Sequence, residues 1–214
     1  MDTANDFRIR LAEKALEELE KSLNNIKVQR RKELVRAVSG LKSEIQIVKY
    51  SYMPFEELAE FESTVKISET AKGILDAVLK AERDFHQLNS KYWLEYLAHL
   101  PALLKRGQIE KAFEAVRYFS GEIISTVQIS DGLWLCSFDC GFKMEVVTNS
   151  QEFRAGRNAV VSYLPPRQFG DVVSEGMFVP AELDRRGELD HSEILSIRDR
   201  LGEVEAIVLS LLQP

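Results

Sequence analysis

The sequence contains little cysteine and little histidine, and this shortage restricts its chemistry. Its two cysteines, Cys136 and Cys140, lie four residues apart in a segment whose composition predicts an extended chain, which holds them too far apart to bond. A zinc site needs more ligands at closer spacing, so we expect two buried thiols. The three histidines, His86, His99 and His191, are scattered without a converging cluster of ligands. We therefore expect no metal site and no cofactor.

Long apolar runs and catalytic motifs are also missing. No stretch of about eighteen apolar residues could span a bilayer, and the opening MDTANDFRIR lacks the apolar core of a signal peptide. These absences predict an intracellular, cytoplasmic protein with no membrane association. The sequence shows no Ser-His-Asp order, no phosphate-binding loop and no dinucleotide fingerprint. We therefore expect that the protein is not an enzyme.

Positive charge is scarce in the second half of the chain. The formal net charge is −6, which argues against a general polyanion binder because phosphate contacts need a surplus of lysine and arginine. Residues 1–119 carry 20 Lys and Arg against 19 Asp and Glu, whereas residues 120–214 carry 8 against 15. So few cations imply weak, salt-sensitive binding of nucleic acid unless they converge at one site.

The first half does have helical periodicity. One set of apolar residues recurs at steps of three and four from Ile9 to Ile26, and a second set runs from Leu34 to Val48. Each set forms one face of an amphipathic helix. The two stripes could form a hairpin or one bent rod. They could also seek a partner subunit or pack within the same chain.

Further helical patterns continue to residue 119. Pro54 ends the second stripe because its ring and its missing N–H oppose a continuing helix, and PFEELAEF then restarts one. The same periodicity recurs in SETAKGILDAVLKAERDF, SKYWLEYLAHLPALLKRG and QIEKAFEAVRYF. These patterns predict an all-helical domain over residues 1–119.

After Gly121 the pattern changes from helical to extended. Five short stretches are rich in β-branched and aromatic residues and are separated by turn residues: EIISTVQI, LWLCSFD, KMEVVT, AVVSYL and MFVPAE. Five strands at this spacing predict a small closed barrel over residues 120–183, in which closure removes exposed strand edges. HSEILSIRDRLGEVEAIVLSLL then predicts a helix in a C-terminal extension over residues 184–214. The predicted fold class is therefore α+β.

The barrel segment carries a recognisable order of motifs. The strand pair LWLCSFDCG is followed by an apolar strand, a proline–basic turn and a Ser-x-Gly-Met signature in NAVVSYLPPRQFGDVVSEGMFVPA. In order and spacing, residues 121–181 resemble the tRNA-binding domain family, which includes free-standing chaperone-like dimers and the C-terminal module of methionyl-tRNA synthetase. The resemblance implies an OB-type barrel that recognises tRNA structure. It also implies a homodimer.

The resemblance further implies which residues bind RNA. Ser174 and Met177 fall on positions that contact tRNA, and Gly176 between them permits close approach of the backbone. Arg167 lies where the family has a basic residue after proline, and Asn149 corresponds to a loop at the mouth of the binding face. A hydroxyl can donate to phosphate, while methionine offers a polarizable surface to a base. The alternative is a strand-opening turn with Met177 packed inside.

Other arginines extend this set. Arg154 and Arg157 lie with Arg167 in loops that flank one strand, where they could converge. Arg30 and Arg31 belong to the basic run KVQRRKELVR at a helix junction. Such a run is either a solvated face or, beside the barrel, a track for the tRNA backbone. The helical domain would then contact RNA or mediate dimerisation.

Two functions are consistent with this sequence. The first is a non-catalytic tRNA-binding protein that assists an aminoacyl-tRNA synthetase, a tRNA-processing enzyme or another translation protein. The second is a protein-interaction scaffold in a translation complex, whose acidic barrel no longer binds RNA, because fold alone does not determine function. A continuous basic strip from Arg167 to Arg30 would favour the first, and scattered arginines would favour the second.

Overall fold

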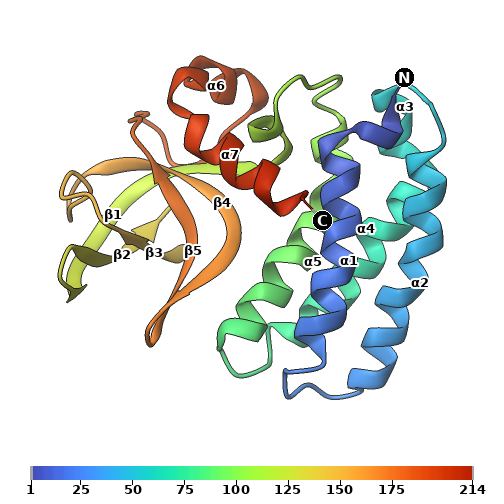
Figure 1. The fold of residues 1–214 in the computed structure, drawn as a ribbon, viewed down its shortest axis with the longest axis horizontal. Coiled ribbons are helices and arrows are strands. Elements are labelled where there is room, and N and C mark those ends of the chain that lie inside the picture. The colour runs from blue at the N-terminus through green and yellow to red at the C-terminus, as the bar shows by residue number, and fades with distance from the viewer. Residues whose placement is uncertain (1, 214) are drawn as a thin grey trace. The chain divides into compact units, whose positions relative to one another are not determined.

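The computed structural model describes residues 2–213, which divide into two compact units. The helical unit contains the chain up to Ala115 together with the last residues from Leu209 onward. The sheet unit contains Val116–Val208. In Figure 1 the helices of the first unit run from blue to green, and the strands of the second run from yellow-green to orange.

The helical unit is arranged around one central helix. Its elements are η1 (Thr3–Asn5), α1 (Phe7–Leu23), α2 (Arg31–Lys49), α3 (Phe55–Glu60), α4 (Glu62–Val78), α5 (Phe85–Leu104) and η2 (Ala112–Ala115). Helix α5 packs against α1, α3 and α4. Its buried residues include Tyr92, Trp93 and Tyr96, whose rings contact one another edge-on or stacked. These aromatic side chains therefore form the core of the unit.

The two amphipathic stripes form a helical hairpin. Lys49 at the end of α2 contacts Glu13 near the start of α1 at 2.9 Å, and Lys42 contacts Glu20 further along α1 at 2.8 Å. This order of contacts requires antiparallel helices. Both stripes are buried within the chain, apart from the half-buried Leu34. The apolar faces therefore pack inside this subunit.

A buried ion pair connects three of these helices. The Arg8 side chain is fully buried, and its guanidinium contacts Asp6 Oδ2 at 2.7 Å. The same group donates to the Leu103 carbonyl of α5 at 2.8 Å and lies 4.4 Å from the centre of the Phe55 ring of α3. Asp6 also caps α1 by accepting the backbone N–H of Arg8. One buried charge thus joins α1, α3 and α5.

The sheet unit is an antiparallel sheet that curls toward closure. The strands are β1 (Arg117–Ser130), β2 (Leu133–Asp139), β3 (Lys143–Thr148), β4 (Asn158–Phe169) and β5 (Val172–Val179), with β6 (Gly187–Glu188). The hydrogen-bonded order is β3-β2-β1-β4-β5, and β6 pairs with β1 beside this path. Strands β3 and β5, the two ends of the path, lie against each other. The closed barrel predicted from the sequence is not formed: among the described strands no ladder pairs β3 with β5, so the sheet is open.

The C-terminal region is helical but interrupted. It contains α6 (His191–Ser196), η3 (Arg198–Arg200) and α7 (Gly202–Leu211). Helix α6 starts at a capping box in which the Asp190 side chain accepts the Glu193 N–H, and the Glu193 side chain accepts the Asp190 N–H. Helices, antiparallel sheet and terminal helix together confirm the predicted α+β class. Within residues 2–213, no helix has the length and apolar character needed to cross a membrane.

The helix predicted for QIEKAFEAVRYF is wrong. This segment forms only η2 and then enters β1 at Arg117. Before the strand, the Glu114 side chain accepts the backbone N–H groups of Glu110 and Lys111, at 3.0 and 2.8 Å. The residues from Arg117 then pair with β4. A short apolar run is consistent with either a helix or a strand. Here the hydrogen bonds to β4 make the end of the segment a strand.

The proline–basic segment is not a turn. Strand β4 continues through Pro165 and Pro166, and its pairing with β5 shifts register between Tyr163 and Arg167. Proline has no N–H to donate, so it fits where the ladder is interrupted. The chain reverses later, at Gly170, whose φ of 60° is in the left-handed region. The Ser-x-Gly-Met signature therefore lies inside β5.

Replacing Arg8 by alanine should lower the free energy of unfolding by about 3–5 kcal/mol, because Asp6 would stay buried without its counter-charge. Urea unfolding followed by far-UV circular dichroism measures this loss. The control is Arg36→Ala, which removes an exposed arginine of α2 and should change stability by less than about 0.5 kcal/mol. Equal stability of the two variants would contradict the role given to the buried pair.

Candidate functional site

The seam between β3 and β5 is closed by the Ser174 hydroxyl. Ser174 Oγ accepts the backbone N–H of Val147 at 2.9 Å and donates to the Gly176 carbonyl at 2.8 Å. Next to it, the Glu175 carboxylate accepts the N–H of Glu145 at 3.2 Å. Ser174 is only 4% exposed. Its hydroxyl is therefore committed to joining the two strands.

Gly176 is required by the approach of β4 to β5. A Cβ atom at this position would lie 2.6 Å from the Ser162 carbonyl oxygen and 2.8 Å from Val161 Cγ1. Neither separation is tolerated by ordinary packing. In addition, the Ser162 hydroxyl donates to the Met177 carbonyl at 3.0 Å. The glycine of the signature thus fixes the spacing of two strands.

The largest group of predicted site residues lines one hollow, which we call the main hollow and which has a volume of about 500 Å³. Five of the predicted residues line it: Asn149, Arg167, Ser174, Gly176 and Met177. Its other walls come from the start of β2, the ends of β3 and β4, and the first turns of α7. A cavity of this size accommodates a small organic group such as a nucleobase.

Aromatic and basic side chains meet at the edge of the main hollow. The Arg167 guanidinium is exposed and lies 5.9 Å from the centre of the Phe169 ring. Phe153 stacks on Phe178 with ring centres 4.4 Å apart and planes 13° apart, and both residues line the hollow. Met177 is half-buried, so part of its side chain faces the space. The sequence reading overlooked Phe153 and Phe169, although Phe153 immediately precedes the predicted Arg154.

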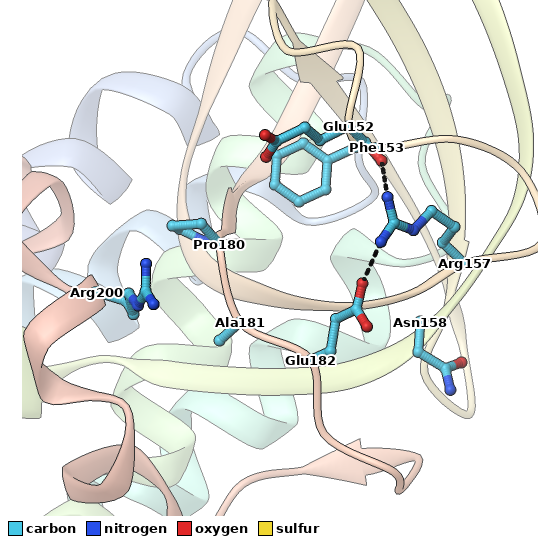
Figure 2. A pocket seen from close by; sticks show the side chains of 8 residues that line it. All are labelled: Glu152, Phe153, Arg157, Asn158, Pro180, Ala181, Glu182 and Arg200. Carbon is cyan, nitrogen blue, oxygen red and sulfur yellow. Dashed lines mark hydrogen bonds and ion pairs between the residues drawn. The ribbon is translucent and has the colours of Figure 1, made fainter.

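Arg154 and Arg157 line two neighbouring hollows. Arg154 borders a hollow of about 530 Å³, which we call the Trp134 hollow, together with Thr126 and Gln128 of β1. Arg157 borders a hollow of about 390 Å³, which we call the Arg200 hollow and which Figure 2 shows. Phe153 lines all three hollows. The arginines therefore do not share one cavity, but one aromatic ring connects their cavities.

Arg30 and Arg31 belong to the helical unit. Both are exposed, and Arg30 adopts a left-handed conformation with φ 54° just before α2. Arg31 donates to the Asn24 carbonyl at 3.0 Å, whereas Arg30 approaches Glu33 only to 3.9 Å. Their side chains are accessible to an anion. They lie on a different unit from the three hollows.

The main hollow carries little positive charge. Among the described residues that line it, Arg167 is the single cation, while Glu152 and Glu203 are acids. Arg157, in the Arg200 hollow, pairs with Glu182 at 2.8 Å. Electrostatic attraction to phosphate therefore depends on individual arginines rather than on a broad basic surface.

Three titratable groups near the β2–β3 turn and in β2 have pKa values that their surroundings shift. Burial raises the pKa of the Cys136 and Cys140 thiols, so both stay protonated near neutral pH. The Gly141 N–H and the Arg186 guanidinium lower the pKa of Asp139, which they both contact. Across residues 2–213 no group of three or more His, Cys, Asp or Glu is placed to hold a metal ion.

Comparison with known proteins covers the helical part of the chain. A family model described as "Alpha helical domain" matches residues 1–107, which is half of the sequence and includes α1 to α5. No tRNA-binding family is detected. No curated protein matches the chain. The sheet unit and its hollows lie outside the matched residues.

Replacing Ser174 by alanine should lower the free energy of unfolding by about 1–3 kcal/mol, because the buried Val147 N–H would lose its acceptor. Chemical unfolding monitored by tryptophan fluorescence reports on this unit when Trp93 of α5 is replaced by phenylalanine in every variant, which leaves Trp134 of β2 as the single tryptophan. Ser125→Ala is the matched control, since Ser125 is an exposed serine of β1. If both variants were equally stable, the hydroxyl would not be holding the seam.

Proposed function

We propose that this chain, which belongs to the alpha helical domain family through residues 1–107, is a non-catalytic RNA-binding protein. Its sheet unit would hold an unpaired segment of RNA in the main hollow, and tRNA is the RNA that the signature of β5 suggests. The supporting observation is the convergence of Arg167, Phe169 and Met177 on one hollow of suitable size. Ser174 and Gly176 shape that hollow instead of contacting RNA through their side chains.

The position of the hollow supports this proposal. Partly open barrels of the OB type bind oligonucleotides on strands 2 and 3 and between the loops that follow strands 1 and 4. Here Leu133 follows the Asp131-Gly132 turn after β1, and Phe169 precedes the turn at Gly170 after β4. Both Leu133 and Phe169 line the main hollow. The hollow thus occupies the part of the sheet that such barrels use.

The chemistry of the lining suits an unstacked base next to a phosphate. Bases stack on aromatic rings and on arginine planes, and Phe169 with Arg167 offers both surfaces. Met177 adds a polarizable, adaptable wall. Because Arg167 is the single cation in this hollow, stacking contributes more to affinity than counterion release. Binding should therefore be moderate in strength and weakly dependent on salt, in contrast to the salt-sensitive binding expected from the sequence, because few phosphate contacts give a shallow slope.

The same proposal extends to the setting of the protein. A tRNA-binding role would place it in the cytoplasm, acting as a homodimer that assists an aminoacyl-tRNA synthetase or a tRNA-processing enzyme. The exposed Arg30 and Arg31 of the helical unit would supply additional contacts to the RNA backbone. These partners rest on the resemblance of residues 121–181 alone.

A protein-interaction scaffold is the second candidate function. Strand β4 pairs with β1 only from Arg117 to Glu122, so the following part of β1 is less covered. On that part Ile124 is 48% exposed and Val127 is 58% exposed. Exposed β-branched residues on a strand edge favour addition of a partner's strand. This observation concerns a different surface from the main hollow, so the two functions can be separated.

Replacing Arg167 by alanine should weaken the binding of unfractionated tRNA about tenfold, because it removes a charged hydrogen bond to phosphate. It should also reduce the slope of log affinity against log salt by about 0.7, the value for one phosphate contact on a single strand. Fluorescence anisotropy titrations at several salt concentrations measure both quantities.

Lys143→Ala is the control for this titration, since Lys143 is an exposed cation of the same sheet but does not line the main hollow. Its affinity and salt slope should match those of the unmodified protein. Absence of tRNA binding at low salt would exclude the proposed function and leave the scaffold. Equal losses in both variants would show attraction to charge in general.

Replacing Glu152 by glutamine should strengthen RNA binding by up to about fivefold, because an exposed carboxylate in the lining repels phosphate by up to about 1 kcal/mol. Glu152 lines both the main hollow and the Arg200 hollow. Glu122→Gln removes an equal charge from β1, outside these two hollows, and should have little effect. Unchanged affinity of the Glu152 variant would indicate that RNA does not pass this carboxylate.

A further inference from the structure

The main hollow does not end at the β5 signature. It shares three lining residues with the Arg200 hollow: Glu152, Phe153 and Pro180. The two hollows therefore adjoin each other at Phe153 and Pro180. The second hollow is lined by residues of the β3–β4 loop, the segment after β5 and η3.

The two arginines of the Arg200 hollow differ in how they are engaged. Arg157 donates to the Glu152 carbonyl at 3.3 Å and to the Glu182 carboxylate at 2.8 Å, so its charge is already compensated. Figure 2 shows this pair of bonds, with Arg200 on the other side of Pro180 and Ala181. Among the described residues, no carboxylate lies within ion-pair distance of Arg200, which is exposed. Its guanidinium is therefore available to a ligand.

From this arrangement we infer that Arg200 binds a second phosphate of the same RNA segment, beyond the phosphate held by Arg167. The inference rests on the proposed function and extends its site to the C-terminal region, outside the stretch that resembles a tRNA-binding domain. A guanidinium presents parallel N–H donors that match two phosphate oxygens. The path then runs from Arg167 along the main hollow, past Phe153, to Arg200.

The lining explains why a phosphodiester chain fits better than an acidic peptide. The shared wall of the two hollows is formed by an aromatic ring and a proline, which offer a flat apolar surface to a base. The carboxylates of Glu152 and Glu182 leave the Arg200 hollow without a surplus of positive charge. An acidic side chain would pair with Arg200 but would gain no stacking contact. A nucleotide would gain both the ion pair of its phosphate with Arg200 and the stacking of its base on the apolar wall.

The test uses the full chain with Arg200→Ala, Arg200→Lys and Arg198→Ala. Arg198 is the matched control, because it lies on the same 3₁₀ helix, is exposed and does not line the hollow. Labelled unstructured oligouridines of two and eight nucleotides are titrated by anisotropy at several salt concentrations. Thermal unfolding of each variant checks that the fold is intact.

We expect Arg200→Ala to weaken binding of the eight-nucleotide RNA about tenfold and to reduce its salt slope by about 0.7. Arg200→Lys should restore the salt slope, since it keeps the charge, but only part of the affinity. Arg198→Ala should change neither quantity. The two-nucleotide RNA carries one internucleotide phosphate, which Arg167 would bind, and it should therefore bind equally to all variants.

Several outcomes would overturn the inference. If the unmodified protein binds the longer RNA but Arg200→Ala and Arg198→Ala behave alike, the Arg200 site is excluded while the proposed function stands. If inorganic phosphate at the concentration of the RNA displaces it equally well, or a polyglutamate peptide binds with the same dependence on Arg200, the site is not specific for RNA. If the unmodified protein binds no RNA, the proposed function itself fails.

Discussion

The two ends of the sheet are joined at a seam, where the Ser174 hydroxyl is one of two β5 side-chain groups that accept backbone N–H groups of β3. Strands β3 and β5 end the hydrogen-bonded path, and unpaired edges of this kind expose backbone groups that need partners. The Ser174 hydroxyl is such a partner: it accepts the Val147 N–H of β3 and donates to the Gly176 carbonyl of β5. The curvature that results leaves the main hollow beside the seam. The Ser174 side chain is thus a structural bridge that also lines the main hollow.

Electrostatic pairing determines what the acidic sheet unit can attract. Four of the eight arginines of this unit form close ion pairs with carboxylates: Arg117 with Glu188, Arg157 with Glu182, Arg185 with Glu193 and Arg186 with Asp139. A ligand that offers only negative charge meets neutralised guanidinium groups and a net acidic surface. A ligand that combines phosphate with a flat apolar ring gains contacts that the pairing does not cancel. Under the proposed function, the unit would therefore discriminate between ligands by shape and stacking more than by charge.

Much of the fold could be predicted from the sequence, because amphipathic helices and strands each bury one face and therefore show a regular spacing of apolar residues. It was insufficient where a residue's role depends on a distant neighbour. Ser174 and Val147 are 27 residues apart, and nothing local reveals that their strands meet. QIEKAFEAVRYF has a helical pattern, yet the pairing of its end with β4 makes that end a strand. Phe153 was missed for the same reason, since its stacking on Phe178 follows from the curl of the sheet.

The position of Phe153 has a consequence for how such a site changes over evolution. This residue lies in the loop between β3 and β4 and borders three hollows at once. Gly176 and Ser174 are constrained by backbone contacts, so substitution there damages the sheet before it alters a ligand. The Phe153 ring stacks on one strand residue, Phe178, and a change of side-chain size at Phe153 would alter all three spaces together. Under the proposed function, ligand preference in this unit would therefore shift in a single mutational step.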